Sequence, residues 1–257
     1  MIENEKTNHL GKRVFFLHPS AFMQNQVISE LAQEEFEVYI IKDEKKMLKA
    51  LENYPDSIFF ASINETMRES AWVELIHTIR KKPKTSSVSV GIIASSNDEN
   101  TRRKYTELLT LQCGYTVVKS DPNAATKLLA TILNDTNAKG RRKYLRIVID
   151  KEGQATINLP MNGTFINGNI KDISAVGVSC IFHDDPELKK NSLFGDMQLR
   201  MQSQLVKAEG IVFGSRKDGG EEVYVILFSQ RMDPSVRSKI RKYINGCLQH
   251  KMDVELT

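Results

Sequence analysis

Three arginines stand together near the middle of the chain, in the sequence GRRKYLRI at residues 140–147. Arg142 and Arg146 have an R-x-x-x-R spacing, and Arg141 comes directly before them. The planar guanidinium group forms paired hydrogen bonds with phosphate and with the O6 and N7 edge of guanine, and it stacks on purine rings. Two arginines four residues apart in an extended or loosely turned segment can reach around one ligand.

A second group follows in KDISAVGV at residues 171–178, where Asp172, Ser174 and Gly177 have a D-x-S-x-x-G spacing. A carboxylate can accept hydrogen bonds from the N1 and N2 donors of guanine, and a serine hydroxyl can donate to phosphate. Gly177 permits a tight turn or a positive φ. Each group alone is common, in basic linkers and in turns between strands. In this order they favour a guanine nucleotide with its phosphates.

Composition is typical of a globular protein with buried cores, since 40% of the 257 residues are hydrophobic and 26% are charged. The net charge of +4 divides into −1 for residues 1–135 and +5 for the rest, which places an anionic ligand in the second half. Three scattered cysteines favour a reducing compartment over a disulfide framework or a zinc site. A polar N-terminus and short apolar runs predict a cytoplasmic protein without membrane insertion.

Residues 1–135 alternate short apolar runs with helical patterns. Strands are expected at residues 13–17, 36–42, 57–62, 88–94 and 115–119, and a helix is expected after each. Five such units predict an α/β domain with a parallel five-stranded, flavodoxin-like sheet that helices cover on both faces.

The order of these elements and the CGYTVVK ending resemble the receiver domains of response regulators. The resemblance places Lys119 at the position of the strand-five lysine, and Ser95 and Ser96 where receivers keep a hydroxyl. The family's acidic pair is replaced by Leu17-His18-Pro19, and Ala61 or Ser62 stands at the phosphoacceptor position. Without clustered carboxylates the domain lacks a magnesium cage and a nucleophile. It is therefore interpreted as a pseudo-receiver for dimerisation or for docking an unknown protein partner.

Residues 136–146 form a polar, then basic linker that carries the arginines, and residues 147–257 change to repeated strands with turn residues between them. Six or seven antiparallel strands predict a small closed β-barrel, followed by a terminal helix that Asp233 caps. The turn residues at 217–220 predict one of its hairpins.

The arginine and aspartate groups, in this order and in this setting, resemble the two signatures of the PilZ family, receptors for cyclic di-GMP, from about Gly140 to the C-terminus. The resemblance implies phosphate and guanine-stacking roles for Arg142 and Arg146. It further implies barrel-side ligand contacts for Asp172, Ser174 and Gly177. In PilZ proteins an additional arginine at the position of Arg141 is associated with an intercalated pair of cyclic di-GMP molecules, and that mode is predicted.

The resemblance implies a non-enzymatic effector that changes its domain arrangement on binding cyclic di-GMP. Motility, surface or virulence functions would then be regulated through a protein partner. Two alternatives remain: a nucleic-acid-binding regulator, which lacks a helix-turn-helix pattern, and a PilZ interaction module that binds no ligand. No motif supports catalytic residues, a metal site or a cofactor.

Overall fold

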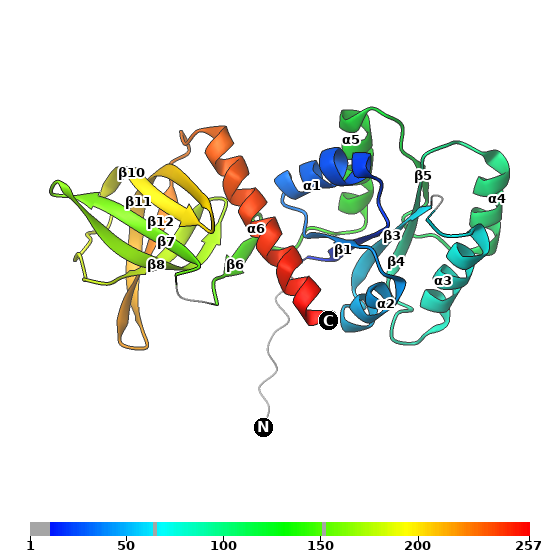
Figure 1. Cartoon of the computed structure of the whole chain (residues 1–257), viewed down its shortest axis with the longest axis horizontal. Helices are drawn as coiled ribbons and strands as arrows, with labels where there is room; N and C mark the ends of the chain where they lie inside the picture. Colours follow the sequence, from blue (N-terminus) through cyan, green and yellow to red (C-terminus); the bar gives the residue numbers. More distant parts are fainter. Residues whose placement is uncertain (1–10, 64–65, 151–152) are drawn as a thin grey trace, which may run out of the picture. The chain divides into compact units, whose positions relative to one another are not determined.

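The computed structural model describes residues 11–63, 66–150 and 153–257, which form two compact units (Figure 1). The first unit extends to Lys143 and also includes Leu248–Thr257, and the second unit is Tyr144–Cys247. The first ten residues, which include most of the polar N-terminus used in predicting a cytoplasmic protein, lie outside the described residues.

The first unit contains a parallel five-stranded sheet in the order β2-β1-β3-β4-β5. Its strands are β1 (Arg13–Leu17), β2 (Val38–Ile41), β3 (Ser57–Ile63), β4 (Ser89–Ala94) and β5 (Tyr115–Val117). The predicted receiver-like α/β fold is confirmed. The strands are mostly apolar, as expected where helices cover both faces of a sheet.

Helices α2 (Glu44–Asn53), α3 (Glu69–Lys81) and α4 (Glu99–Leu108) pack on one face of this sheet, with Trp72 fully buried in their shared core. The other face is covered by η1 (Met23–Ile28), a π-helical segment continued by α1 (Ser29–Gln33), and by α5 (Pro122–Asp135). Successive strand residues point to opposite faces, so Phe59 belongs to the first core and Phe60 to the second. Asp43 caps α2, accepting a hydrogen bond from the amide of Lys46 at 2.7 Å.

The last ten residues of the chain complete this first unit. Gln249 forms two hydrogen bonds with the main chain of Ile40, accepting from its amide at 2.9 Å and donating to its carbonyl at 3.0 Å. Met252 and Leu256 are buried in the core that contains α2 and α3, and Tyr54 donates to Glu255 at 2.5 Å. The end of the terminal helix therefore covers β2, an edge strand of the sheet.

The second unit is an antiparallel barrel. Its strands are β6 (Arg146–Val148), β7 (Ala155–Met161), β8 (Thr164–Ser174), β9 (Gly177–Phe182), β10 (Leu193–Met201), β11 (Gln204–Asp218) and β12 (Glu221–Phe228). The order is β6-β8-β7-β10-β11-β12-β9, and an additional β8–β9 pairing closes a ring of six strands on which β6 is a seventh. This confirms the predicted closed barrel.

The terminal helix is α6 (Pro234–Glu255). Asp233 accepts a hydrogen bond from the amide of Ser235 at 2.7 Å, so the predicted cap is present. Ile240, Tyr243 and Ile244 are buried along its apolar side, as the helical periodicity indicates.

Candidate functional site

The predicted site residues of the barrel lie on three neighbouring strands. Strand β8 pairs with β6 on one side and with β9 on the other. In the ladder Arg146 of β6 lies opposite Ser174 of β8, and Val148 lies opposite Asp172. Residues two positions apart along a strand point to the same face of the sheet. Arg146 and Asp172 are therefore diagonal neighbours on one face. The structure thus brings the second arginine of the first motif onto the acid of the second motif.

Arg146 and Asp172 form a close ion pair. The Nε atom of Arg146 donates to Oδ1 of Asp172 at 2.6 Å, and Nη2 lies 2.5 Å from the same oxygen. The Arg146 side chain is 42% exposed, whereas the Asp172 side chain is only 14% exposed. The edge of the guanidinium is therefore used in the pair, and much of the group still faces solvent.

Ser179 on β9 completes this arrangement, although it does not belong to either motif. It is fully buried and donates its hydroxyl hydrogen bond to Oδ2, the other carboxylate oxygen of Asp172. The hairpin register could have identified it, because Ser174 pairs with Gly177 and the ladder then places Asp172 opposite Ser179. Both oxygens of the acid are thus held by fixed donors.

The acid also affects the chemistry of a neighbouring thiol. Burial raises the pKa of the Cys180 thiol on β9 to about 12, and the negative charge of Asp172 contributes in the same direction. Cys180 therefore remains a neutral thiol at physiological pH.

Ser174 and Gly177 hold the turn between β8 and β9. The Ser174 hydroxyl donates to the carbonyl of Gly177 at 3.3 Å and accepts from the amide of Val176 at 3.4 Å. Gly177 does not have the positive φ that its residue type permits. Its missing side chain is required for another reason, because a Cβ at this position would lie 2.5 Å from the carbonyl oxygen of Ile226 on β12.

Arg237 supports the same turn from helix α6, and neither motif indicates it. Its Nη1 atom donates to the carbonyl of Ala175 at 2.9 Å, and Nη2 donates to the carbonyl of Ser229 at 3.0 Å. The half-buried guanidinium therefore joins the turn that carries the second motif to the segment that leads into α6.

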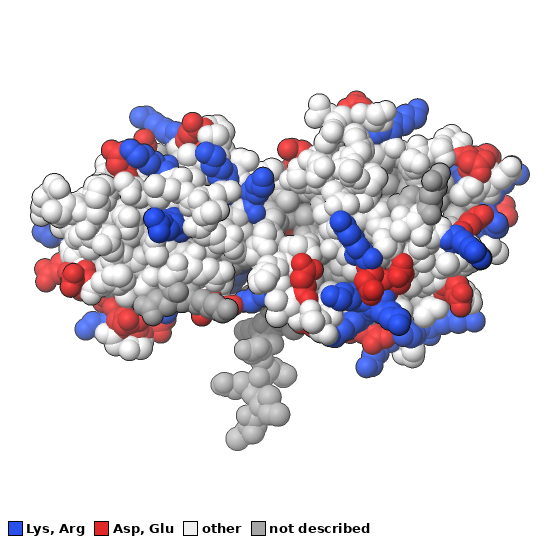
Figure 2. Space-filling model, in the orientation of Figure 1, with Lys and Arg blue, Asp and Glu red and all other residues white. Residues whose placement is uncertain are grey.

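Arg141 and Arg142 lie outside regular structure, directly before β6, and both are exposed. Neither forms a hydrogen bond or an ion pair with another described residue. On the face shown in Figure 2, basic and acidic side chains are interspersed over both units. This face of the barrel therefore carries no broad field of one sign.

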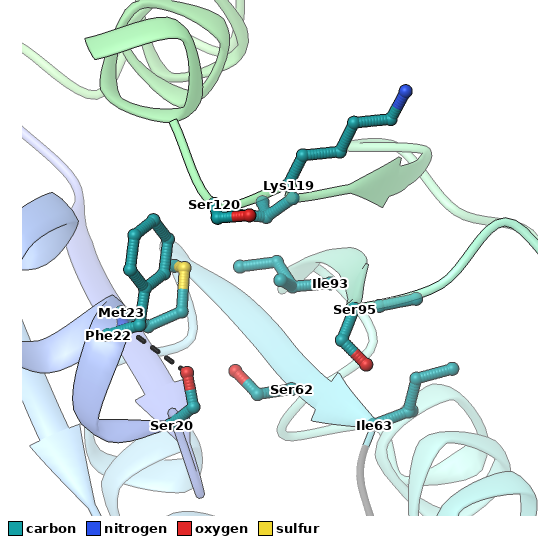
Figure 3. Close-up of a pocket in the computed structure, with 11 residues that line it drawn as sticks. Ser20, Phe22, Met23, Ser62, Ile63, Ile93, Ser95, Lys119 and Ser120 are labelled. Atoms are coloured by element: carbon teal, nitrogen blue, oxygen red, sulfur yellow. Dashed lines mark hydrogen bonds between the residues drawn. The ribbon is translucent and has the colours of Figure 1, made fainter. Parts of the chain in front are cut away.

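A second group of predicted residues lies in the first unit, where receivers carry their phosphoacceptor. A cavity of about 550 Å³ opens at the carboxyl ends of β1, β3, β4 and β5 (Figure 3). Of the two residues that the sequence left open, Ser62 lines this cavity and Ala61 is buried in the core with α2 and α3. Lys119 is at the mouth and pairs with no carboxylate among the described residues.

No group of three His, Cys, Asp or Glu side chains in the part of the chain that the structure describes is placed to hold a metal ion. Among the described helices, none combines the length and the apolar character that a membrane span requires.

The second unit thus belongs to a class of small closed barrels whose first strand brings an arginine to an acid on the following hairpin. A family model described as the PilZ domain matches residues 140–246, and this part of the chain is similar to that family. It is joined to the receiver-like α/β unit. No curated protein sequence matches the chain.

Several solved structures are similar to parts of the chain. Escherichia coli YcgR in complex with c-di-GMP is similar over 46% of this chain and 50% of its own, with 13% identity and a TM-score of 0.40. The Bacillus subtilis inhibitor of motility MotI/DgrA is similar over 43% of this chain and 53% of its own, with 15% identity and a TM-score of 0.37. A response regulator protein from Burkholderia multivorans is similar over 48% and 94%, with 18% identity and a TM-score of 0.36. The chain thus matches about half the length of the first two proteins.

Proposed function

We propose that this protein is a receptor for cyclic di-GMP, which its PilZ domain binds through Arg141, Arg142, Arg146 and the β8–β9 hairpin. The match of residues 140–246 to the PilZ domain supports this proposal, as does the presence of every position of both motifs. The role is binding rather than catalysis, and the ligand is a signal rather than a cofactor.

The observation that carries the proposal is the chain of contacts from Arg146 through Asp172 to Ser179. Asp172 holds the edge of the guanidinium, which leaves the flat faces of that group able to stack on a guanine base. Each carboxylate oxygen has two lone pairs, so Asp172 can accept from a guanine edge while it keeps both of its present donors. The pair is therefore preorganised, and less ordering entropy opposes binding.

Arg141 and Arg142 have a different role in this proposal. Both are exposed, and neither is committed to a partner among the described residues. They are suited to close on the phosphates of the ligand, where a guanidinium forms bidentate hydrogen bonds. With Arg141 present, the ligand is an intercalated pair of cyclic di-GMP molecules.

The response to binding is a change in domain arrangement. The compact units divide after Lys143, so Arg141 and Arg142 are among the last residues of the first segment and Arg146 is near the start of the second. A ligand that holds all three arginines restricts the backbone of the proposed linker, residues 136–146. Because such a ligand makes more contacts in the closed arrangement, it shifts the population toward that arrangement.

The output passes through a protein partner that docks on the receiver-like unit. Regulation of motility, surface or virulence functions is the type of output that the PilZ resemblance implies. This part of the proposal depends on the family resemblance, whereas the binding site depends on the residues described above.

The test is calorimetric titration of the full chain with cyclic di-GMP. Arg142→Ala and Arg146→Ala should each weaken binding by about 30-fold or more, since truncating one member of a desolvated charge pair costs at least ~2 kcal/mol. Arg216→Ala, which removes an exposed arginine of β11 away from both motifs, is the matched control and should bind as the unaltered chain does.

Two outcomes would count against the proposal at different levels. Unchanged affinity in both arginine variants would overturn the site assignment. One ligand molecule per protomer in the unaltered chain would overturn only the intercalated pair, for which a stoichiometry of two is expected.

A further inference from the structure

The cavity of the receiver-like unit lies where ligands bind in open α/β sheets. It is outside the carboxyl ends of the strands, at the point where the strand order reverses between β1 and β3. Its volume of about 550 Å³ is that of a small-molecule site. Nothing in the PilZ domain contributes to it, so what it binds is a separate question from cyclic di-GMP.

The hydroxyl of Ser62 is the observation that points to a ligand. Ser62 is only 4% exposed, and its Oγ atom has no hydrogen-bond partner among the residues that the structure describes. A buried hydroxyl without a partner costs about 1–3 kcal/mol, so buried polar groups are almost always paired. In Figure 3 this hydroxyl points toward the side of the cavity where Ser20 lies. A bound molecule would supply the missing partner.

The polar side chains around Ser62 can all donate hydrogen bonds. Three further serines line the cavity, namely Ser20, Ser95 and Ser120, and Lys119 stands at its mouth. No Asp or Glu is among the described lining residues, so the cavity presents hydroxyl groups and one ammonium group to its contents. Hydroxyl and ammonium donors are suited to binding an oxyanion and do not favour a metal cation. Acidic receivers have the reverse preference, because their carboxylates hold a metal cation.

The remaining wall is apolar. Side chains of Phe22, Met23, Ile63, Ile93 and Val118 line it. A surface of this kind is suited to a hydrocarbon body, which gains about 25 cal/mol for each Å² removed from water. Because one lysine supplies a single positive charge, the head group that matches it best carries a single negative charge.

We propose that this cavity binds a small organic monocarboxylate, whose head group contacts the serine hydroxyls and whose short apolar body lies against the wall of Phe22 and Ile93. The Lys119 side chain extends away from the cavity in Figure 3. Its flexible four-carbon stem allows the ammonium group to fold over the mouth when a carboxylate is bound. The receiver-like unit is then a second ligand-sensing module of this chain.

The experiment is a titration of the full chain, followed by NMR of its isoleucine methyl groups, with hexanoate as the probe. Hexanoate should shift the methyl signals of Ile63 and Ile93 in a saturable manner. Hexanol, which lacks the charge, and inorganic phosphate, which lacks the apolar body, should each bind at least about 10-fold more weakly, since a hydrogen bond to a charged group contributes ~1.5 kcal/mol or more.

Ser57 offers a matched control for Ser62, because it is on the same strand, is 1% exposed and also has a hydroxyl without a partner, but it does not line the cavity. Ser62→Ala should lose about 10-fold in hexanoate affinity, and Ser57→Ala should lose none. Neither variant should be less stable than the unaltered chain, which separates a ligand contact from a structural role.

The proposal is overturned if hexanoate produces no saturable shift, or if hexanol or phosphate binds as well as hexanoate does. It is also overturned if Ser62→Ala binds hexanoate as tightly as Ser57→Ala. None of these outcomes depends on the result of the titration with cyclic di-GMP.

Discussion

Each unit of this protein places polar residues at the ends of its strands, but the two sites are in opposite states. In the barrel, both oxygens of Asp172 already accept hydrogen bonds, from Arg146 and from the buried Ser179. In the receiver-like sheet, the buried hydroxyl of Ser62 has no partner among the described residues. The polar groups of the first candidate site already hold one another, whereas the second has a hydrogen-bonding group that remains unused.

This difference shows what a buried charged group requires and what a buried neutral polar group can do without. A carboxylate that is 14% exposed cannot remain ionised at low cost without donors, so the barrel supplies them from two neighbouring strands. A neutral hydroxyl is tolerated without a partner because its penalty is smaller. A cavity whose described lining holds no acidic residue can therefore keep a serine without a partner and leave the sheet folded.

The largest expected effect tests whether the motif glycine supports the barrel itself. Gly177→Ala should lower the free energy of unfolding by about 3 kcal/mol, since its Cβ would meet the carbonyl oxygen of Ile226 and neither backbone can move away freely. Gly195→Ala on β10 is the control, because a Cβ there meets nothing within 4 Å.

Urea denaturation measures this difference. Trp72, the single tryptophan, belongs to the first unit, so its fluorescence follows that unit while far-UV circular dichroism follows both. Equal stability of the two glycine variants would show that Gly177 is not required by packing.

The next effect compares the two buried serines directly. Ser179→Ala should destabilise the barrel by about 2 kcal/mol, because it leaves one oxygen of a largely buried carboxylate without its donor. Ser62→Ala removes a hydroxyl that has no partner, so the first unit should not lose stability. Denaturation curves of the two variants that shift by the same amount would remove the distinction between a paired and an unpaired site.

The smallest effect concerns pH and the buried cysteines, one in each unit. Burial raises the pKa of Cys113 to about 11 and that of Cys180 to about 12. In the unfolded chain these thiols lose their protons near pH 8.5, whereas in the folded chain they keep them to higher pH. The contribution of each thiol to the free energy of unfolding is therefore fully present below pH 8.5 and is lost as the pH rises toward the pKa of the folded state.

Between pH 8 and 9.5 the loss for each thiol is about 1 kcal/mol. Cys180→Ala should remove that share of the pH dependence from the barrel, and Cys113→Ala should remove it from the first unit. Both thiols should behave alike, since both folded pKa values lie above this window. A pH dependence that neither substitution alters would contradict the prediction.

The sequence predicted the fold well where periodicity is strong. Strand β1 begins and ends at the expected residues, because a short apolar run is a strong signal. The end of the terminal helix could not be predicted in the same way. The periodicity of a helix does not show that Met252 and Leu256 enter the core of the first unit.

The candidate sites differ in the same way. Arginine and aspartate are conspicuous in a sequence, so the motif residues of the barrel could be named before the structure was known. Ser179 and Arg237 were missed because their roles depend on strand register and on helix placement. The cavity at Ser62 is formed by residues from four strand ends, and its serines and apolar side chains have no distinctive spacing.

The paired hydrogen bonds between Gln249 and Ile40 have a further consequence, for the solubility of the chain. A side-chain amide there takes the place of a neighbouring strand, and it occupies main-chain groups that would otherwise be open to strand addition by another molecule. A chain cut after Cys247 would lose this cover and expose the apolar residues beneath Met252 and Leu256. The last ten residues therefore block strand addition, and with it polymerisation, at this edge of the sheet.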